Sequence, residues 1–169
     1  MEFSQYLNLI ENKLQSNFDK NDDFNIDGYT YDLFAEYHQR SERFFLTKKA
    51  TIFGIENNEY VLIKHFENID KIILDNYIYN LIKSVDSVVK PHDDHMSSII
   101  TGIIVLDNKI TSKNNLIIDI VKKFKYHKGF SFGFKGWVDI RLLIVFLKDN
   151  YMLTNKKGEE VVTVYSIIK

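Results

Sequence analysis

The sequence contains no cysteine and a single proline among its 169 residues. The absence of cysteine excludes a disulfide framework, a thiolate metal site and a cysteine nucleophile. The apolar run at residues 142–147 is far shorter than the roughly 18 residues that a membrane-spanning helix needs. No GxSxG, GxxxxGK[ST], GxGxxG or HExxH motif is present. The sequence therefore gives no support to a serine hydrolase, a P-loop enzyme, a dinucleotide-binding enzyme or a zincin.

The first residues, MEFSQYLNLIENK, lack the basic segment and apolar core of a secretory signal peptide. With no membrane span and no cysteine, this predicts a cytoplasmic protein that does not enter a membrane. The chain is rich in Ile, Lys and Asn, which AT-rich codons encode, and this indicates a bacterium of low GC content.

Aromatic residues are abundant: 13 Phe and 10 Tyr can fill much of a core by themselves. The overall composition, 45% hydrophobic and 27% charged, is typical of a globular protein. The length fits one domain with a sizeable core, and no repeat or linker divides the chain. We therefore expect one domain over residues 1–169.

The net charge of −1 hides a segregation of charge along the chain. From Asn108 onward there are 12 Lys and Arg against 5 Asp and Glu, or +7; before it there are 10 against 18, or −8. Two interpretations follow. The halves attract each other within one fold, or the second half forms a basic face that binds an anion.

The first half predicts a helix followed by an antiparallel meander. Apolar residues at helical spacing indicate a helix over residues 3–18, and alternating aromatics from Tyr29 indicate a strand over residues 29–38. A second strand is expected at residues 43–46, and a hairpin joins residues 51–55 to residues 60–66. Polar turns are predicted between these elements, at residues 21–28, 39–42 and 56–59.

The second half predicts alternating helices and strands. Asn68 begins a helix to Val85 whose apolar face is Ile69, Ile72, Ile73, Tyr77, Ile82 and Val85. A buried strand over residues 99–106, a helix starting at Ser112 and a long strand ending at Leu147 form a crossover unit with parallel strands. Strands at residues 151–154 and 161–168 complete an α+β fold: a single mixed β-sheet with an N-terminal antiparallel meander, a βαβ crossover and about three packed helices.

The densest cluster of functional side chains is the basic aromatic stretch at residues 122–137. Exposed aromatics stack on bases and lysines pair with phosphates, so this stretch is a candidate nucleic-acid surface. Lys125, Lys128 and Lys135 are its candidate binding lysines. The alternative is structural: lysines suit the end of a helix, and Phe130, Phe132 and Phe134 would form a core stripe on one strand face.

A charged pair lies on the long strand that follows. Trp137, Asp139 and Arg141 share one face of this strand, while its even positions from Val138 to Phe146 are wholly apolar. A buried charge is costly unless it is paired. Asp139 and Arg141 are therefore held in a salt bridge, either with each other or with a residue on another strand, or they form a polar pocket in which Arg141 anchors an anion.

Two further constellations point to metals. His92, Asp93, Asp94 and His95 are potential ligands, but their spacing matches no established site, so we predict a solvated loop, no metal and no cofactor. The order of the first elements is similar to the core of restriction-endonuclease-like proteins. That family places Glu or Gln two residues before a lysine on the third strand. In this sequence the lysine would be Lys64, and the residue two positions before it is Leu62. A degenerate nuclease would have to use Asp32, Glu59 and Lys64.

Three segments carry a resemblance to a known family: HMSSIITGIIV from His95, KFKYHKGFSFGFKGW from Lys123 and TNKKGEE from Thr154. They resemble stretches of an uncharacterised family of small bacterial proteins, a domain of unknown function. The resemblance implies a single domain and transfers no activity, cofactor or site.

Three functions remain. The first is a non-enzymatic domain that binds a partner, such as a protein, through the surface around Lys125 to Trp137. The second is nucleic-acid binding through the same lysines, and the third is the degenerate nuclease-like metalloprotein. No catalytic residue is assigned.

Overall fold

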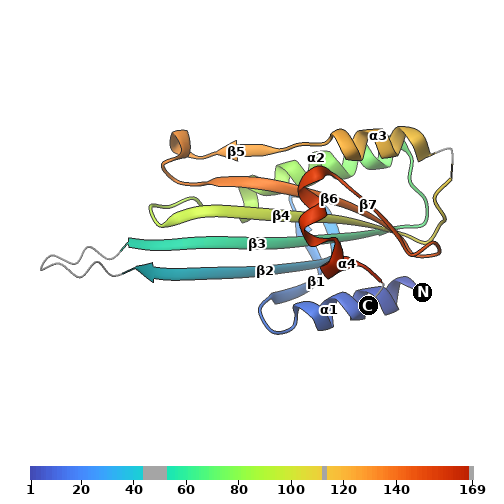
Figure 1. The fold of residues 1–169 in the computed structure, drawn as a ribbon, viewed down its shortest axis with the longest axis horizontal. Coiled ribbons are helices and arrows are strands. Elements are labelled where there is room, and N and C mark those ends of the chain that lie inside the picture. Colours follow the sequence, from blue (N-terminus) through green and yellow to red (C-terminus); the bar gives the residue numbers. More distant parts are fainter. Residues whose placement is uncertain (44–52, 112–113, 168–169) are drawn as a thin grey trace, which may run out of the picture.

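A computed structural model describes residues 1–43, 53–111 and 114–167. Within these residues, seven strands form one mixed sheet with α-helices packed on both faces (Figure 1). The strand order is β1-β2-β3-β4-β6-β5. Strand β7 also pairs with β6, on the same edge as β5 but farther along the strand. The α+β class and the single mixed sheet predicted from the sequence are therefore confirmed.

The first half contains longer strands than the sequence predicts. Its elements are α1 (Phe3–Leu14), β1 (Asp19–Ile26), β2 (Tyr29–Arg43) and β3 (Phe53–Phe66). The turn predicted at residues 21–28 is wrong for most of its length, because β1 pairs there with β2 as the edge strand of the sheet. Its side chains are mostly exposed, so it lacks the alternating apolar pattern that marks a strand.

The turns predicted at residues 39–42 and 56–59 are also wrong. Both segments lie within one antiparallel ribbon, in which Gln39 pairs with Asn57 and Arg40 with Glu56. Polar residues occur here because an antiparallel sheet tolerates a solvent-facing side. In Figure 1 this end of β2 and β3 extends beyond the other strands. Of the strand predicted at residues 43–46, residues 44–46 lie outside the described residues, as does the start of the predicted hairpin at 51–52.

The second half forms two crossovers. It contains α2 (Lys71–Val88), β4 (His95–Leu106), α3 (Asn115–Lys123) and β6 (Trp137–Phe146). Strand β4 lies between β3 and β6 and is parallel to both, as predicted for β4 and β6. The cap of α2 is Asp70, whose carboxylate accepts from Ile73 N at 2.8 Å, and not Asn68. The predicted cap Ser112 lies outside the described residues.

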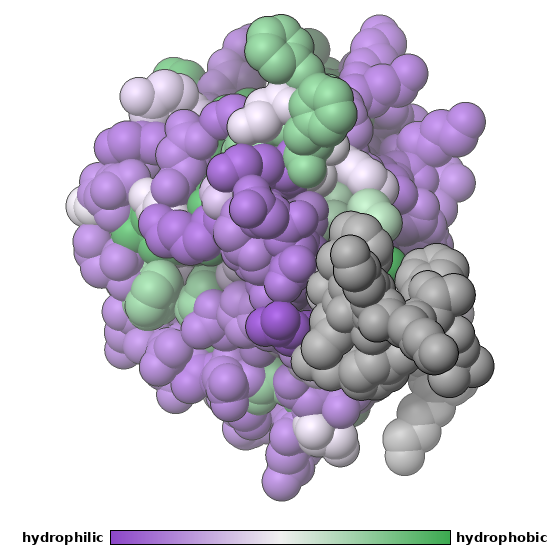
Figure 2. Space-filling view, turned by 90° about the vertical axis from the view of Figure 1, so that its left-hand side faces the viewer, coloured by the Kyte–Doolittle hydropathy of each residue, from purple (hydrophilic) through white to green (hydrophobic). Residues whose placement is uncertain are grey.

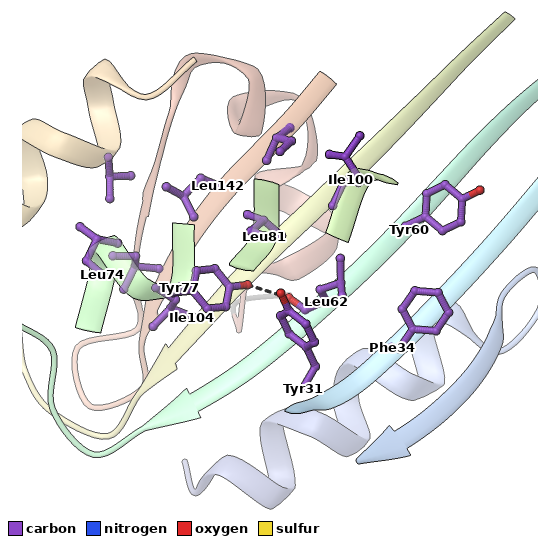
Figure 3. Close-up of a cluster of buried hydrophobic side chains, with 14 of the residues drawn as sticks. Tyr31, Phe34, Tyr60, Leu62, Leu74, Tyr77, Leu81, Ile100, Ile104 and Leu142 are labelled. Carbon is purple, nitrogen blue, oxygen red and sulfur yellow. Dashed lines mark hydrogen bonds between the residues drawn. The ribbon is translucent and has the colours of Figure 1, made fainter. Parts of the chain in front are cut away.

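The buried face of α2 agrees with the predicted one at Tyr77 and Val85 but differs from it elsewhere. Leu74, Tyr77, Leu81 and Val85 are buried, whereas Ile72 is 78% exposed. Residues at i, i+3, i+4 and i+7 share a helix face, and the set starting at Leu74 fits this spacing better than the predicted set. In Figure 3 Leu74, Tyr77 and Leu81 meet Leu62, Ile104 and Leu142 of the sheet. The Tyr77 hydroxyl donates to Leu62 O at 2.9 Å.

The two faces of β6 belong to two cores. Its even positions, from Val138 to Phe146, pack beneath α2 and α3, as predicted. Leu143 and Val145 pack with α1 and with Tyr165 of α4 (Val162–Tyr165) on the other face. Trp137, Asp139 and Arg141 share this second face, at the end nearer the β5–β6 connection.

The outer edge of β6 is covered in three pieces. Strand β5 (His127–Gly129) pairs with its start, and β7 (Tyr151–Thr154) pairs with its end. Between them, the buried Asn155 side chain accepts from Leu142 N at 3.0 Å and donates to Ile140 O at 3.1 Å. The strand predicted at residues 161–168 is wrong over its described part, residues 161–167, because η3 (Lys156–Val161) and α4 follow β7 instead.

Candidate functional site

The connection between β5 and β6, residues 130–136, forms an exposed hairpin loop that we call the aromatic loop. Its single helical turn is η2 (Ser131–Gly133). Phe132 is fully exposed and Phe134 is 87% exposed, so the prediction that all three phenylalanines form a core stripe is wrong. Only Phe130 packs against the core. Figure 2 looks onto this end of the sheet, where apolar side chains stand out over η2 from a mostly hydrophilic surface.

The core interpretation fails because the predicted strand ends at Gly129. The chain then turns through Ser131 (φ 48°) and Phe132 (φ 56°), and the alternation of faces is lost. Left-handed backbone is unfavourable for residues with a Cβ, at about 1–2 kcal/mol each. Strain of this kind persists only where surrounding contacts enforce it, and it concentrates at functional sites.

Hydrogen bonds hold the aromatic loop in one conformation. Phe130 N donates to Gly136 O at 2.9 Å, and Lys135 N donates to Phe130 O at 3.2 Å. The loop is also tied to β4, because Nδ1 of the buried His95 lies 2.7 Å from Lys135 O. The side chains of Phe132 and Phe134 therefore project from a loop that backbone hydrogen bonds close at its base.

We expect Phe132→Gly to leave the protein equally stable or to raise its free energy of unfolding by up to about 1 kcal/mol. Glycine removes the left-handed strain at this position, and the exposed ring contributes little buried area. Urea denaturation measures the change. A loss of more than 1 kcal/mol would mean that the Phe132 ring packs against the protein.

The lysines of the stretch differ in their partners. Lys128 Nζ lies 2.6 Å from Asp86, and Lys135 Nζ lies 3.4 Å from Asp93. The hydrogen bond to Asp86 raises the pKa of Lys128. Among the described residues, Lys125 forms no ion pair. Together with the contact between Arg141 and Glu59, these pairs join the basic half of the chain to the acidic half.

Asp139 and Arg141 belong to one charge network but do not pair with each other. Arg141, 6% exposed, lies 3.0 Å from Glu160 and 3.6 Å from Glu59, which is on β3. Asp139 lies 2.7 Å from Nδ1 of His127 and 3.8 Å from Lys157. With two carboxylates beside it, the Arg141 guanidinium is placed as in the cross-strand salt-bridge interpretation and not as a free anion anchor.

Glu160 makes part of this network dependent on pH. Its partial burial raises its pKa, but hydrogen bonds from Lys157 and Arg141 outweigh this and lower the pKa below its usual value. Because the pKa of Glu160 is lower in the folded protein than its value near 4.5 in the unfolded chain, the ionised carboxylate stabilises the fold above pH 4.5. This stabilisation is lost as the pH falls through the folded-state pKa.

We expect Glu160→Gln to lower the free energy of unfolding at pH 7 by less than about 1 kcal/mol, because solvent screens the half-exposed Glu160 carboxylate. The difference from the wild type should shrink as the pH falls below 4.5. Urea denaturation at a series of pH values tests this; a difference that is constant across the series would show that the carboxylate charge is not responsible.

A pocket of about 340 Å³ opens at the sheet edge between β5 and η3. Phe124, Tyr126 and Ile140 contribute apolar surface, and Lys125, Asp139 and Glu160 contribute charge. The structure thus brings together Lys125 and Asp139 from the predicted set. Trp137, Lys128 and Lys135 do not line this pocket; they lie at or beside the aromatic loop.

The histidines at residues 92 and 95 have separate roles. His95 begins β4 and is buried, with Nε2 2.8 Å from Ser98 Oγ, so the predicted solvated loop is wrong at this residue. His92 Nε2 instead lies 3.3 Å from Glu56. In the part of the chain that the structure describes, no group of three His, Asp or Glu side chains is arranged to hold a metal ion.

The nuclease-like residues are divided between the two faces of the sheet. Asp32 and Lys64 lie 3.5 Å apart. Glu59 has the opposite parity to Lys64 on β3 and contacts Arg141 on the other face. These three side chains therefore do not converge on one point.

Sequence reasoning did not identify Asn155, Glu160 or the contact between His92 and Glu56. Asn155 occurs three residues before Gly158, whose N–H it accepts at 2.9 Å, and such an Asn-x-x-Gly turn is a recognisable signal. Glu160 and Glu56 carried no such signal, because each also contacts a residue far along the chain, Arg141 for Glu160 and His92 for Glu56.

The fold defines an α+β protein with one mixed sheet, and the described residues include no helix long and apolar enough to cross a bilayer. Residues 2–167 match the family model described as Domain of unknown function (DUF8052), and the chain belongs to this family. No curated protein and no solved structure matches the chain.

Proposed function

We propose that this chain is a non-enzymatic binding domain that recognises a protein partner through the aromatic loop. The observation that carries the proposal is the fully exposed Phe132 ring on a hydrogen-bonded, strained loop. Aromatic side chains are enriched at the centres of protein interfaces, and a preformed loop loses little conformational entropy on binding.

Neighbouring side chains suit an apolar contact with a polar rim. Met96 and Trp137, 40% and 37% exposed, add apolar surface next to the loop. Gly136 packs against the backbone of Met96, so these residues belong to one surface. Lys128 and Lys135 are paired with carboxylates. This balance of charge favours a protein over a polyanion as the partner.

Photo-crosslinking from the loop tests this proposal. p-Benzoylphenylalanine replaces Phe132 in the chain expressed in its own host, and Tyr79 on α2, 65% exposed, is the matched control position. We expect a discrete protein adduct from position 132 and none from position 79. No adduct at position 132, or the same adducts from both positions, would overturn the proposal.

A second candidate is nucleic-acid binding, which the exposure of Phe132 and Phe134 also favours because free rings can stack on bases. Lys125 adds a cation without an ion-pair partner in the described chain. This function predicts affinity for single-stranded DNA or RNA that falls steeply between 50 and 200 mM salt, with a slope set by the lysines engaged. Fluorescence anisotropy that detects no binding at low salt would exclude it.

A further inference from the structure

A second pocket, of about 410 Å³, lies on the α2 face of the sheet, near the end of α2. Strands β1, β2 and β3 form its floor and the α2–β4 connection forms its side. It is separate from the aromatic loop and from the edge pocket, with which it shares no lining residue. Its lining residues are Asn21, Phe24, Phe34, Glu36, His38, Glu56, Asn58, Tyr60, Ser87, Val88, Lys90 and His92.

The floor of this pocket is aromatic. Phe24 and Phe34 are stacked with ring centroids 4.3 Å apart, and Phe34 lies 6.3 Å from Tyr60. Figure 3 shows Phe34 and Tyr60 side by side on β2 and β3. Aromatic faces carry negative partial charge and attract organic cations within about 6 Å.

The pocket also holds two carboxylates that no lysine or arginine neutralises among the described residues. Glu36 lies 3.2 Å from His38, and Glu56 lies 3.3 Å from His92. The buried Asn58 links these two pairs of side chains: its amide donates to Glu56 at 2.8 Å, and its oxygen lies 2.8 Å from His38 Nδ1. Burial raises the pKa of Glu56, but the hydrogen bonds from Asn58 and His92 outweigh it and lower the pKa.

The C-terminal end of α2 adds to the negative potential. The last turn of α2 contains no basic residue, and Val88 from this turn lines the pocket. The carbonyl groups at a helix C-terminus carry partial negative charge that favours a cation. Lys90 is the one lysine in the lining, and it is exposed.

We propose that this pocket binds an organic cation: an ammonium or guanidinium group attached to an apolar body. The charged group lies in the pocket beside the two carboxylates, which the His38 ring and the Asn58 amide separate. The apolar body lies against the aromatic floor, in which Phe24 is the partly exposed ring. A metal ion is a poorer fit, because the described side chains include no three-ligand group. An anion is disfavoured by the two carboxylates and the helix end together.

Calorimetry and ligand-observed NMR with benzyltrimethylammonium test the site, and benzyl alcohol serves as the neutral probe. We expect the cation to bind and the alcohol to bind at least about tenfold more weakly. Glu56→Gln and Glu36→Gln should each weaken cation binding about tenfold, and Lys90→Met should strengthen it. Glu160→Gln removes a carboxylate outside the pocket and should leave binding within twofold.

Absence of cation binding, or equal binding of the two probes, would overturn the proposal. So would a Glu36→Gln variant that keeps the wild-type affinity; Glu36 is the safer test for folding, because Glu56 also holds Asn58. Circular dichroism confirms that each variant is folded. Phe132→Ser should leave cation binding unchanged, so the fate of this proposal is independent of the aromatic loop.

Discussion

Replacing Asn155 by Ala should lower the free energy of unfolding by about 3–4 kcal/mol. The side chain accepts from Leu142 N and Gly158 N and donates to Ile140 O and Phe124 O. Asn155 is 1% exposed, so groups that lose their partner are left in the protein interior. Each unsatisfied buried polar group costs about 1–3 kcal/mol. Urea denaturation measures the loss.

Thr154→Ala is the matched control at the neighbouring position. Its hydroxyl makes one hydrogen bond, to Asn155 O, and its removal should cost about 1 kcal/mol or less. Hydrogen exchange adds a local test, since the Leu142 amide should exchange much faster in Asn155→Ala. If Asn155→Ala were as stable as Thr154→Ala, the Asn155 side chain would not be what closes the edge of β6.

The second large effect is expected for Gly136→Ala, at about 3 kcal/mol or more of lost stability. Gly136 has φ 74°, a conformation that L residues rarely adopt. A Cβ at this position would also lie within 2.7 Å of His95 O and closer still to Met96 O, both backbone atoms of β4. The base of the aromatic loop must therefore move away from β4.

Gly133→Ala separates these two causes within the same loop. Gly133 has φ 90°, but a Cβ there would meet no atom within 4 Å. We expect it to cost only about 1–2 kcal/mol, from backbone strain alone. Fluorescence of Trp137, the only tryptophan, reports displacement of the loop and should change in Gly136→Ala alone. Equal losses of stability would refute the close packing of Gly136 on β4.

The parts of the fold that the sequence predicts are those with strong apolar periodicity. The even face of β6 and the parallel pairing of β4 with β6 follow from such patterns. Strand β1 and the polar halves of β2 and β3 escape prediction because backbone pairing, and not side-chain burial, makes them strands. The C-terminal α4 has apolar residues on too few turns to distinguish it from a strand.

The candidate site is only partly visible in the sequence. The stretch at residues 122–137 marks the right region, but alternation of Phe130, Phe132 and Phe134 suggests a strand where the chain turns. Side-chain partners are the least predictable feature: Arg141 contacts Glu59 from a strand two places away in the sheet. Such contacts depend on strand order, which one sequence does not reveal.

The proposed role of the aromatic loop is tested most directly by one dissociation constant. The protein captured by cross-linking from position 132 is purified, and its affinity is measured by calorimetry for the wild type, Phe132→Ser and Tyr79→Ser. A buried aromatic anchor contributes about 2 kcal/mol or more, so Phe132→Ser should weaken binding at least about 30-fold. Tyr79→Ser should stay within twofold. Equal affinities for Phe132→Ser and the wild type would contradict the proposal.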